Sequence, residues 1–463
     1  DNRWGFFPGV SAGWIFGRED FIKEAIPVMS FGKLRASYGI NGNASGIGAY
    51  TLQGSYGSSN SNGSFNYNGN TSYLITELPN PNLRWEKTAT FEVGADLSFF
   101  ANRLNTNLTY YNRLTSDKYA ALSFPTSTGF SSVTNNNGEF RNQGIEIELS
   151  GKIIDSKDWT WSASGNIAFN KNKIVSLPDN GMERNRINAF QVYTGNGDEK
   201  KWVGGQQEGQ EPGILYLYQA DGIYRSYDEI PANLVRKYGS RTYYGPEAWN
   251  KLTAEQQNAT TNFPIQPGDT KFHDVNGDDV IDEFDKVKVG ATSPRWTGGF
   301  NTTLRWKNFQ LYGRFDYALG FWLYENSGTQ STTPWFMGCY QGTYNTPTMY
   351  YDTWSESNPN AKYPRYLFAD QNGKNNYIAS TMFAYRGDYL AIREISLSYS
   401  LPESVAKMLK MQRAEVSITG QNLGYITGAK NVGSPEANPK DNGAVGQGYS
   451  LPRTILFGVN LTF

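Results

Sequence analysis

The residues best suited to chemistry in this 463-residue chain form an acidic run near its middle. If Asp274 is position 1, oxygen-bearing side chains follow at positions 3, 5, 9 and 12, and a backbone carbonyl is available at position 7. This spacing is typical of EF-hand-like calcium loops, in which Ca²⁺ takes about six to eight oxygen ligands. The predicted ligands of a structural Ca²⁺ are Asp274, Asn276, Asp278, Val280, Asp282 and Asp285.

Two positions of this run depart from the calcium pattern. Position 6 is Asp279 where a glycine would ease the sharp turn, and Asp285 at position 12 reaches less far than a bidentate glutamate. The alternative is an acidic loop, rich in Asx turns, that is merely solvated. In either case we expect a structural role, in which the loop holds the long segment 176–295 in place.

Other side chains give little support for catalysis. Glu146 and Glu148 share one face of a predicted strand, but that face is expected to contact water. His273 is the only histidine, which argues against a His-based triad, and we expect it to be a structural hydrogen-bonding residue. Cys339 is the only cysteine, which excludes an internal disulfide, and we expect a buried, inert thiol. The chain is therefore not expected to be an enzyme.

The composition favours an all-β protein with large polar loops. Aromatic residues make up 15% of the chain and charged residues 18%, against about 25% charged residues in an average soluble domain. The net charge of −1 does not suggest a surface for nucleic acid. No run approaches the roughly 18 apolar residues of a membrane-spanning helix.

The strongest local signal is the alternation of apolar and polar residues with period 2. At the C-terminus, Ile455, Phe457 and Val459 alternate with smaller or polar residues, with Leu456 the one exception, which is typical of a strand with one apolar face. The alternation predicts eleven strands, at 4–16, 32–41, 88–99, 103–117, 138–150, 159–175, 296–306, 309–323, 389–401, 414–424 and 452–463. In one strand the phase slips at Arg393–Glu394, which predicts a β-bulge there.

The connections between these strands alternate in length. Long loops are predicted at 42–87, 118–137, 176–295, 324–388 and 425–451, and short turns lie between them. Short turns on one side and long loops on the other are typical of transmembrane antiparallel β-barrels of the outer membrane. Aromatic residues near strand ends, such as Trp159, Trp306 and Trp322, fit the interfacial girdles of such barrels.

The long outer loops carry many aromatic side chains among amides and carboxylates. Rings of this kind suit sugar faces and, nearly as well, peptides, although they also pack loop against loop. The candidate substrate contacts are Trp202, Tyr243, Tyr244, Trp249, Trp335, Phe336, Tyr340, Tyr344 and Trp354.

Several motifs, in order along the whole chain, resemble the SusC/RagA-type TonB-dependent outer-membrane transporters of Bacteroidetes. They include PNPNLRWEKTATFEVGADLSFF (79–100), FRNQGIEIEL (140–149), PGDTKFHDVNGDDVIDEFDKVKVGATSPRWTGGFN (267–301), YLAIREISLSYSLP (389–402) and LPRTILFGVNLTF (451–463). The resemblance implies a 22-stranded barrel that is filled by an N-terminal plug and energised through TonB. It also implies a SusD-like surface lipoprotein as a lid, and a dimer of transporter–lipoprotein pairs.

The predicted strand count departs from that family pattern. Eleven strands are half of 22, and an open eleven-stranded sheet would leave two unpaired edges in lipid. We therefore expect residues 1–463 to be the C-terminal half of the barrel, without the plug and the first strands. The rest of the barrel and the plug are then partners of this chain, together with the lipid bilayer.

Three functions fit the sequence to different degrees. The family motifs favour TonB-dependent import of a large nutrient, an oligosaccharide first and an oligopeptide next. The alternatives are a passive or structural outer-membrane barrel and a soluble carbohydrate-binding sandwich, and the alternation of loop lengths argues against the latter. By the same resemblance, the terminal Phe463 is the predicted signal for the barrel-assembly machinery.

Overall fold

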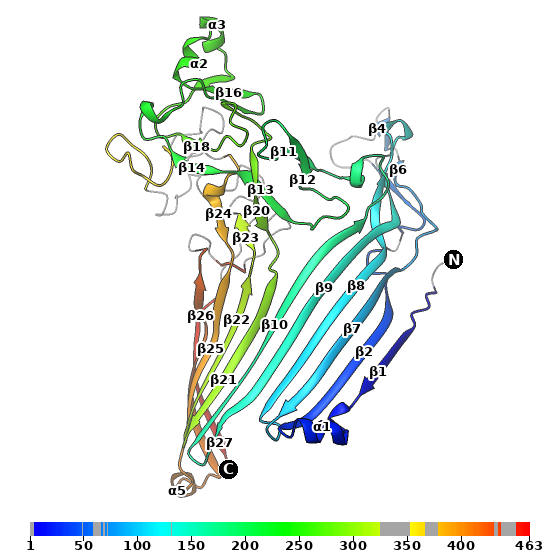
Figure 1. The fold of residues 1–463 in the computed structure, drawn as a ribbon, viewed down its shortest axis with the longest axis vertical. Helices are drawn as coiled ribbons and strands as arrows, with labels where there is room; N and C mark the ends of the chain where they lie inside the picture. Colours follow the sequence, from blue (N-terminus) through cyan, green and yellow to red (C-terminus); the bar gives the residue numbers. More distant parts are fainter. Residues whose placement is uncertain are drawn as a thin grey trace.

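The chain folds into one large antiparallel sheet of eleven strands in a computed structural model (Figure 1). The structure describes residues 4–48, 50–58, 66–67, 70–71, 73–130, 132–324, 352–365, 378–429, 434–436 and 451–463. In sheet order, the strands are β1 (Gly9–Trp14), β2 (Met29–Asn43), β7 (Glu86–Phe99), β8 (Leu104–Ser123), β9 (Ser132–Asp155), β10 (Trp159–Ser176), β21 (Trp296–Trp306), β22 (Phe309–Leu319), β25 (Tyr389–Ser400), β26 (Arg413–Thr427) and β27 (Thr454–Thr462). All eleven predicted strands are thus confirmed.

The pairing register extends the apolar face of each strand across the whole sheet. Leu311 on β22 lies opposite Leu397 on β25, which in turn lies opposite Ile418 on β26. These three side chains are 44%, 44% and 43% exposed, although they lie at the centres of paired strands. A continuous row of exposed apolar side chains is the lipid-facing surface of a membrane barrel.

A row of aromatic rings crosses four neighbouring strands at one end of this face. The ring centroids of Trp159 and Trp306 are 5.7 Å apart, those of Trp306 and Phe309 6.0 Å, and those of Phe309 and Tyr399 4.6 Å. The row lies at the level of the short turns, where an interfacial girdle is expected. Trp322 does not join it, because it lies in β23 (Trp322–Tyr324) among the long loops, where the Arg386 guanidinium covers its ring.

The predicted β-bulge lies where the phase of the sequence slips. Arg314 pairs with Glu394 and the next residue of β22, Phe315, pairs with Ile392, so Arg393 is the extra residue. The irregularity continues into the pairing with β26, between Ile392 and Glu394. The bulge restores the apolar face, because Ile392 and Ile395 both point outward despite being three residues apart.

Short and long connections lie at opposite ends of the sheet (Figure 1). The short ones carry η1 (Phe16–Arg18) and α1 (Asp20–Ala25) before β2, and α5 (Glu403–Met408) between β25 and β26. Strands β8 and β9 are longer than predicted and pair up to Ser123 and Ser132. The predicted loop 118–137 is therefore mostly a strand hairpin that rises above the rest of the sheet.

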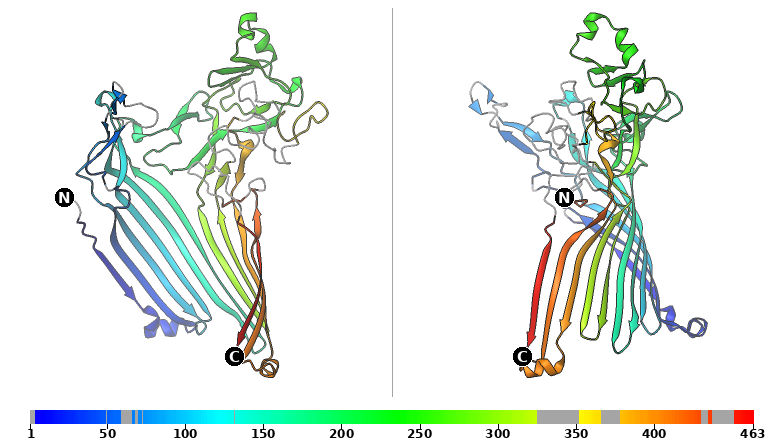
Figure 2. Two further views of the ribbon diagram at one scale, coloured as in Figure 1. Left: turned by 180° about the vertical axis from the view of Figure 1, so that it is seen from behind. Right: turned by 90° about the vertical axis from the view of Figure 1, so that its left-hand side faces the viewer.

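Strands β1 and β27 are the two edges of the sheet. Within the described residues, each pairs on one side only and the two do not pair with each other. Figure 2 shows the sheet as a curved, open wall seen from behind and from the side.

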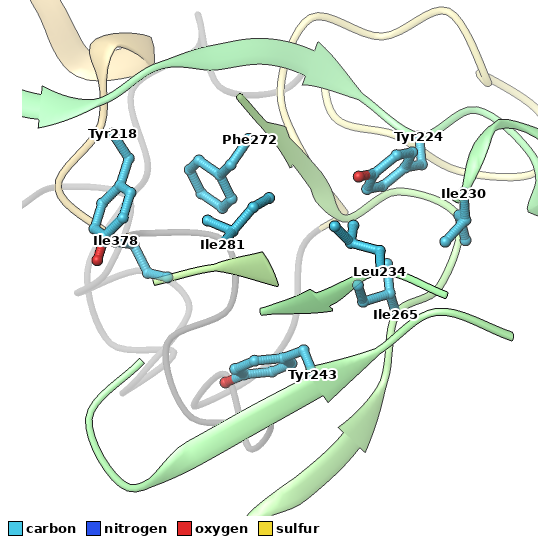
Figure 3. Packing of buried hydrophobic residues seen from close by; sticks show 9 residues of the cluster. All are labelled: Tyr218, Tyr224, Ile230, Leu234, Tyr243, Ile265, Phe272, Ile281 and Ile378. Atoms are coloured by element: carbon cyan, nitrogen blue, oxygen red, sulfur yellow. The ribbon is translucent and has the colours of Figure 1, made fainter. Parts of the chain in front are cut away.

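The long segment 176–295 forms an outer domain above the sheet. Its strands are β11 (Phe190–Tyr193), β12 (Lys200–Val203), β13 (Ile214–Tyr218), β14 (Ala220–Ile223), β15 (Val235–Tyr238), β16 (Arg241–Tyr244), β17 (Asn262–Pro264), β18 (Thr270–Phe272), β19 (Val280–Ile281) and β20 (Lys286–Ala291). Its helices are η3 (Glu183–Asn185), η4 (Tyr227–Glu229), α2 (Pro246–Asn250) and α3 (Ala254–Gln257). A buried cluster holds it together (Figure 3): Tyr218, Tyr224, Ile230, Leu234, Tyr243, Ile265, Phe272, Ile281 and Ile378.

The other loops contain smaller elements. These are β3 (Ser55–Ser58), β4 (Asn66–Tyr67), β5 (Asn70–Thr71), β6 (Tyr73–Glu77), η2 (Thr126–Thr128), η7 (Thr381–Phe383) and β24 (Ala384–Arg386), which pairs with β23. None of the helices in the described part of the chain has the length and apolar character needed to cross a membrane.

Candidate functional site

The inner face of the sheet is polar and carries paired charges. Arg35 on β2 forms an ion pair with Asp96 on β7 at 3.3 Å and donates a hydrogen bond of 2.9 Å to Asn107 on β8. Arg113 and Glu92 form a second pair across β7 and β8, at 3.2 Å. Because these groups are partly exposed, each pair is worth only about 0.2–1 kcal/mol, and their main effect is to keep the inner face hydrophilic.

A cavity of about 560 Å³ lies against this inner face, a volume within the range of small-ligand sites. The polar side chains that line it come from six neighbouring strands and include Asp96, Asn107, Glu148, Asn166, Asn301 and Asp316. Amides, carboxylates and hydroxyls of this kind can exchange hydrogen bonds with a hydrated solute. The inner face can therefore contact polar cargo without a catalytic group.

A second polar cluster surrounds the bulge. Arg393 donates a hydrogen bond of 2.6 Å to Asp316 on β22, and its guanidinium also contacts the Glu436 carboxylate. The hydroxyls of Tyr389 and Tyr425 donate to the same carboxylate, each at 2.8 Å. Burial opposes ionisation of Glu436, but these donors hold the pKa of its carboxyl below the ordinary value. The cluster attaches the last long loop to the inner wall.

The two glutamates with a glycosidase-like spacing lie on an open part of the same wall. Glu146 and Glu148 both belong to β9, point to its inner face and are exposed. Glu148 lines the cavity beside Asn107 and Asn166, the residues opposite it on β8 and β10. Their surroundings are those of the hydrated inner wall, as the alternation predicts.

The acidic run 274–285 is a tight loop between β18 and β20, held by its own backbone. The Asp274 carboxylate accepts from the N–H groups of Gly277 and Asp279, each at 2.8 Å. The buried Asp285 carboxylate accepts from the N–H groups of Val275 at 2.9 Å and Asp282 at 2.7 Å. Asp279 takes a left-handed conformation (φ 61°), so an aspartate makes the turn where glycine was expected.

The electrostatics of this loop are compatible with a bound cation. Burial raises the pKa of Asp285 to about 6, and the neighbouring carboxylates of Asp282 and Asp274 act in the same direction. The Asn276 side-chain oxygen is buried and accepts no hydrogen bond. However, within the described residues no three His, Cys, Asp or Glu side chains are grouped closely enough to hold a metal ion. The carboxylates are aimed at backbone N–H groups, and calcium binding stays a prediction.

Those aromatic residues proposed to bind substrate that lie in the described part of the chain do not form one surface. Tyr243 has no exposed surface and stacks on Phe263 at 5.5 Å, so its ring belongs to the core of the outer domain. Tyr244, the next residue, is half-buried and lies 6.1 Å from the half-buried Trp249. This neighbouring pair is the only part of the predicted set that the structure, in its described residues, brings into ring contact.

Two further members of the set serve as packing residues. Trp202 on β12 lies under the Arg186 guanidinium, 3.9 Å from the ring centroid. Trp354 donates a hydrogen bond of 3.2 Å to the Arg225 carbonyl and lies against Gly268, where no side chain would fit. It thereby attaches segment 352–365 to the outer domain. Trp335, Phe336, Tyr340 and Tyr344, as well as Cys339, lie outside the described residues.

The single histidine has the structural place expected of it. His273 Nδ1 lies 3.1 Å from a carboxylate oxygen of Asp221. The backbone N–H of His273 donates a hydrogen bond to the backbone carbonyl of Gln219. Glu436, by contrast, is a site residue that the sequence did not point to, because its partners on β25 are far away in the chain. The one feature of the sequence that pointed to this cluster was the phase slip at Arg393, because the arginine there interrupts the alternation of apolar and polar residues in its strand.

Known proteins are similar to this chain over its whole length. A family model described as TonB dependent receptor-like, beta-barrel, matches residues 1–244. TonB-dependent receptor P3 of Formosa agariphila is 28% identical over 100% of this chain and 42% of its own length. TonB-dependent receptor SusC of Bacteroides thetaiotaomicron is 26% identical over 100% of this chain and 40% of its own length. The chain thus spans less than half the length of these relatives.

Solved structures show the same fold. The RagAB peptide importer in its closed-closed state matches 100% of this chain and 44% of its own chain, with a TM-score of 0.69 and 22% sequence identity. The RagAB peptide transporter matches 99% of this chain and 43% of its own, with a TM-score of 0.68. At this level of identity, the matches establish the fold of the strands described above.

Proposed function

This chain belongs to the TonB-dependent receptor-like β-barrel family, and from this premise we propose that its protein actively imports a large nutrient across the outer membrane. The protein is located in the outer membrane, and the chain is about 43% of the length of its relatives. The observation that carries the proposal is the continuous two-sided sheet, with an apolar row through Leu311 and Leu397 outside and a polar, cavity-bearing wall inside.

The proposed energy source is TonB, acting on the part of the protein that precedes these strands. The proposed partners are the plug, the rest of the barrel, and a SusD-like lipoprotein that closes over the long loops. The proposed place of the lid is on the outer domain, which lies above the sheet (Figure 1) and is held together by its own buried core (Figure 3). A dimer of transporter–lipoprotein pairs is part of the same proposal.

An oligosaccharide is the proposed cargo and an oligopeptide the second candidate. Residues 44–76 contain no Asp, Glu, Lys or Arg, yet they include five tyrosines or phenylalanines. Within this segment, Tyr56 and Tyr73 are 73% and 70% exposed on the hairpin formed by β3 and β6. Exposed rings in an uncharged surrounding suit the faces and hydroxyls of a neutral sugar chain.

The test is uptake of labelled cargo by cells that carry the full-length protein and its lipoprotein. Pools of neutral oligosaccharides and of oligopeptides are supplied separately, with and without a protonophore and in a strain without TonB. We expect uptake of the sugar pool that stops in both treatments. Uptake of peptides alone would overturn the cargo proposal, and uptake that persists without TonB would favour the alternative of a passive barrel.

A further inference from the structure

We propose that α5 and the turn after it, residues 403–411, form an anchor that lies in the periplasmic headgroup layer of the outer membrane and binds phospholipid. This lipid anchor is a separate feature from the transport path. It rests on the membrane location of the sheet and not on the identity of the cargo.

The anchor lies close to the aromatic row along the membrane normal. The aromatic row that marks the interface ends at Tyr399, and α5 begins at Glu403. Because the strands are tilted, the few residues between Tyr399 and Glu403 extend about 7–10 Å along the membrane normal. This distance is similar to the thickness of one headgroup layer, which is roughly 5–8 Å. The helix therefore lies at the level of the headgroups, next to the girdle.

Helix α5 lies on the outer side of the sheet. Ala414 on β26 points outward, in phase with Val416 and Ile418, but it is 3% exposed where those two are 44% and 43% exposed. Because α5 contacts β26 and its Ala406 is 1% exposed, the helix covers the outer face at the foot of this strand. For comparison, Ala36 on β2 also points outward but is not covered by a helix, and it is exposed. The helix is thus outside the lumen, continuous with the lipid-facing surface.

The two flanks of α5 carry different kinds of side chain. Val405 and Leu409 are four residues apart, share one flank and are 37% and 52% exposed. Glu403 and Lys407 form an ion pair of 2.6 Å on the other flank, about 200° around the helix axis. Met408 is 81% exposed. One apolar flank and one charged flank are the features of a helix that lies in a membrane interface.

The charged side chains of the anchor are mostly cationic. Lys407 and Lys410 outnumber Glu403 within residues 403–411, so this segment has a net positive charge although Glu403 pairs with Lys407. Lys410 ends the helix in a left-handed conformation (φ 56°), which directs the chain back toward β26. Ammonium groups beside exposed apolar side chains suit phosphate headgroups above an acyl boundary. Phospholipid is therefore the occupant that the anchor fits.

The experiment places a nitroxide label on each flank of α5. The full-length protein, with Cys339→Ser, carries Leu409→Cys or Lys407→Cys and is reconstituted in vesicles of phosphatidylethanolamine and phosphatidylglycerol. Power saturation then compares collisions with oxygen, which partitions into lipid, and with a water-soluble nickel chelate. We expect an oxygen-to-nickel ratio that is several-fold higher at position 409 than at position 407.

Two control measurements keep the experiment decisive. A label at Met408→Cys should resemble the label at 409, and one at Ile395→Cys, which points outward near the middle of β25, gives the value for full membrane burial. Equal, water-like ratios at 407 and 409 would overturn the inference. A label at 409 that neither reagent reaches would also overturn it, because it would show that protein and not lipid covers this flank.

Discussion

Arg393, the extra residue of the β-bulge, and Asp316 on the neighbouring strand are joined by an ion pair of 2.6 Å on the inner face of the sheet. The bulge has two consequences at once. It keeps the apolar face of β25 in phase, and it turns one guanidinium toward the inner wall, where Glu436 of the last long loop meets it. A local irregularity of the strand thus becomes the point at which a loop is attached.

Replacing Arg393 by methionine should destabilise the sheet and release the last long loop. The substitution leaves Asp316 and Glu436 without their cation, at an expected cost of about 1–3 kcal/mol. Urea unfolding in vesicles measures the loss. Arg413→Met is the matched control, because the Arg413 side chain is 64% exposed and its pair with Glu415 should be worth less than about 1 kcal/mol. Equal effects of the two variants would contradict this role.

A charge on the outer face should be far more costly than one on the inner face. Ile395→Arg, which points outward near the middle of β25, places a guanidinium in lipid at an expected cost of about 2–4 kcal/mol. Ser396→Arg, one residue later, points to the wet inner wall and should be tolerated. The amount of folded protein in the outer membrane and its urea midpoint give the comparison. The reverse order would mean that the two faces have been assigned wrongly.

Tyr243→Ala should unfold the outer domain rather than weaken cargo binding. Tyr243 has no exposed surface, and truncation of a buried aromatic ring costs about 3–5 kcal/mol. Faster proteolysis within residues 176–295, with the barrel intact, is the expected result. Tyr244→Ala removes a half-buried ring and should leave the domain resistant to protease. Normal protease resistance of the Tyr243 variant would be inconsistent with this core.

Calcium binding to the acidic loop can be tested with two adjacent aspartates. Asp278 is a predicted ligand, whereas Asp279 occupies the turn position and is not. We expect calorimetry to detect Ca²⁺ uptake that Asp278→Asn weakens and Asp279→Asn leaves unchanged, because asparagine tolerates the left-handed conformation. Absence of any heat, with no effect of a chelator on stability, would show that the loop is merely solvated.

Removal of Phe463 should block assembly of the barrel. The residue follows the alternating edge strand β27, and its ring is 75% exposed. We expect the truncated protein to be lost from the outer membrane, whereas Phe463→Tyr keeps an aromatic terminus and should assemble normally. Membrane fractionation and immunoblotting provide the measurement. Normal levels of the truncated protein would exclude the proposed signal.

The sequence alone was sufficient to locate all eleven strands of the sheet and its bulge. The physical reason is that successive side chains of a strand between lipid and water face lipid and water in turn. Their polarity therefore alternates every two residues, and this pattern can be recognised within a short stretch of sequence. A single extra residue such as Arg393 shifts the phase of the alternation, and this shift indicates the bulge. Loop lengths, which are equally local, indicated which end of the sheet carries the long loops.

The roles of individual loop residues were decided only by the tertiary structure. Tyr243 and Tyr244 are neighbours of the same type, yet one is core and the other is half-buried, because β16 faces a core built from distant segments. Glu436 meets Arg393 across 43 residues of sequence, and no local pattern records that contact. Pairings of this kind depend on which segments the folded chain brings together, and composition or spacing cannot specify them.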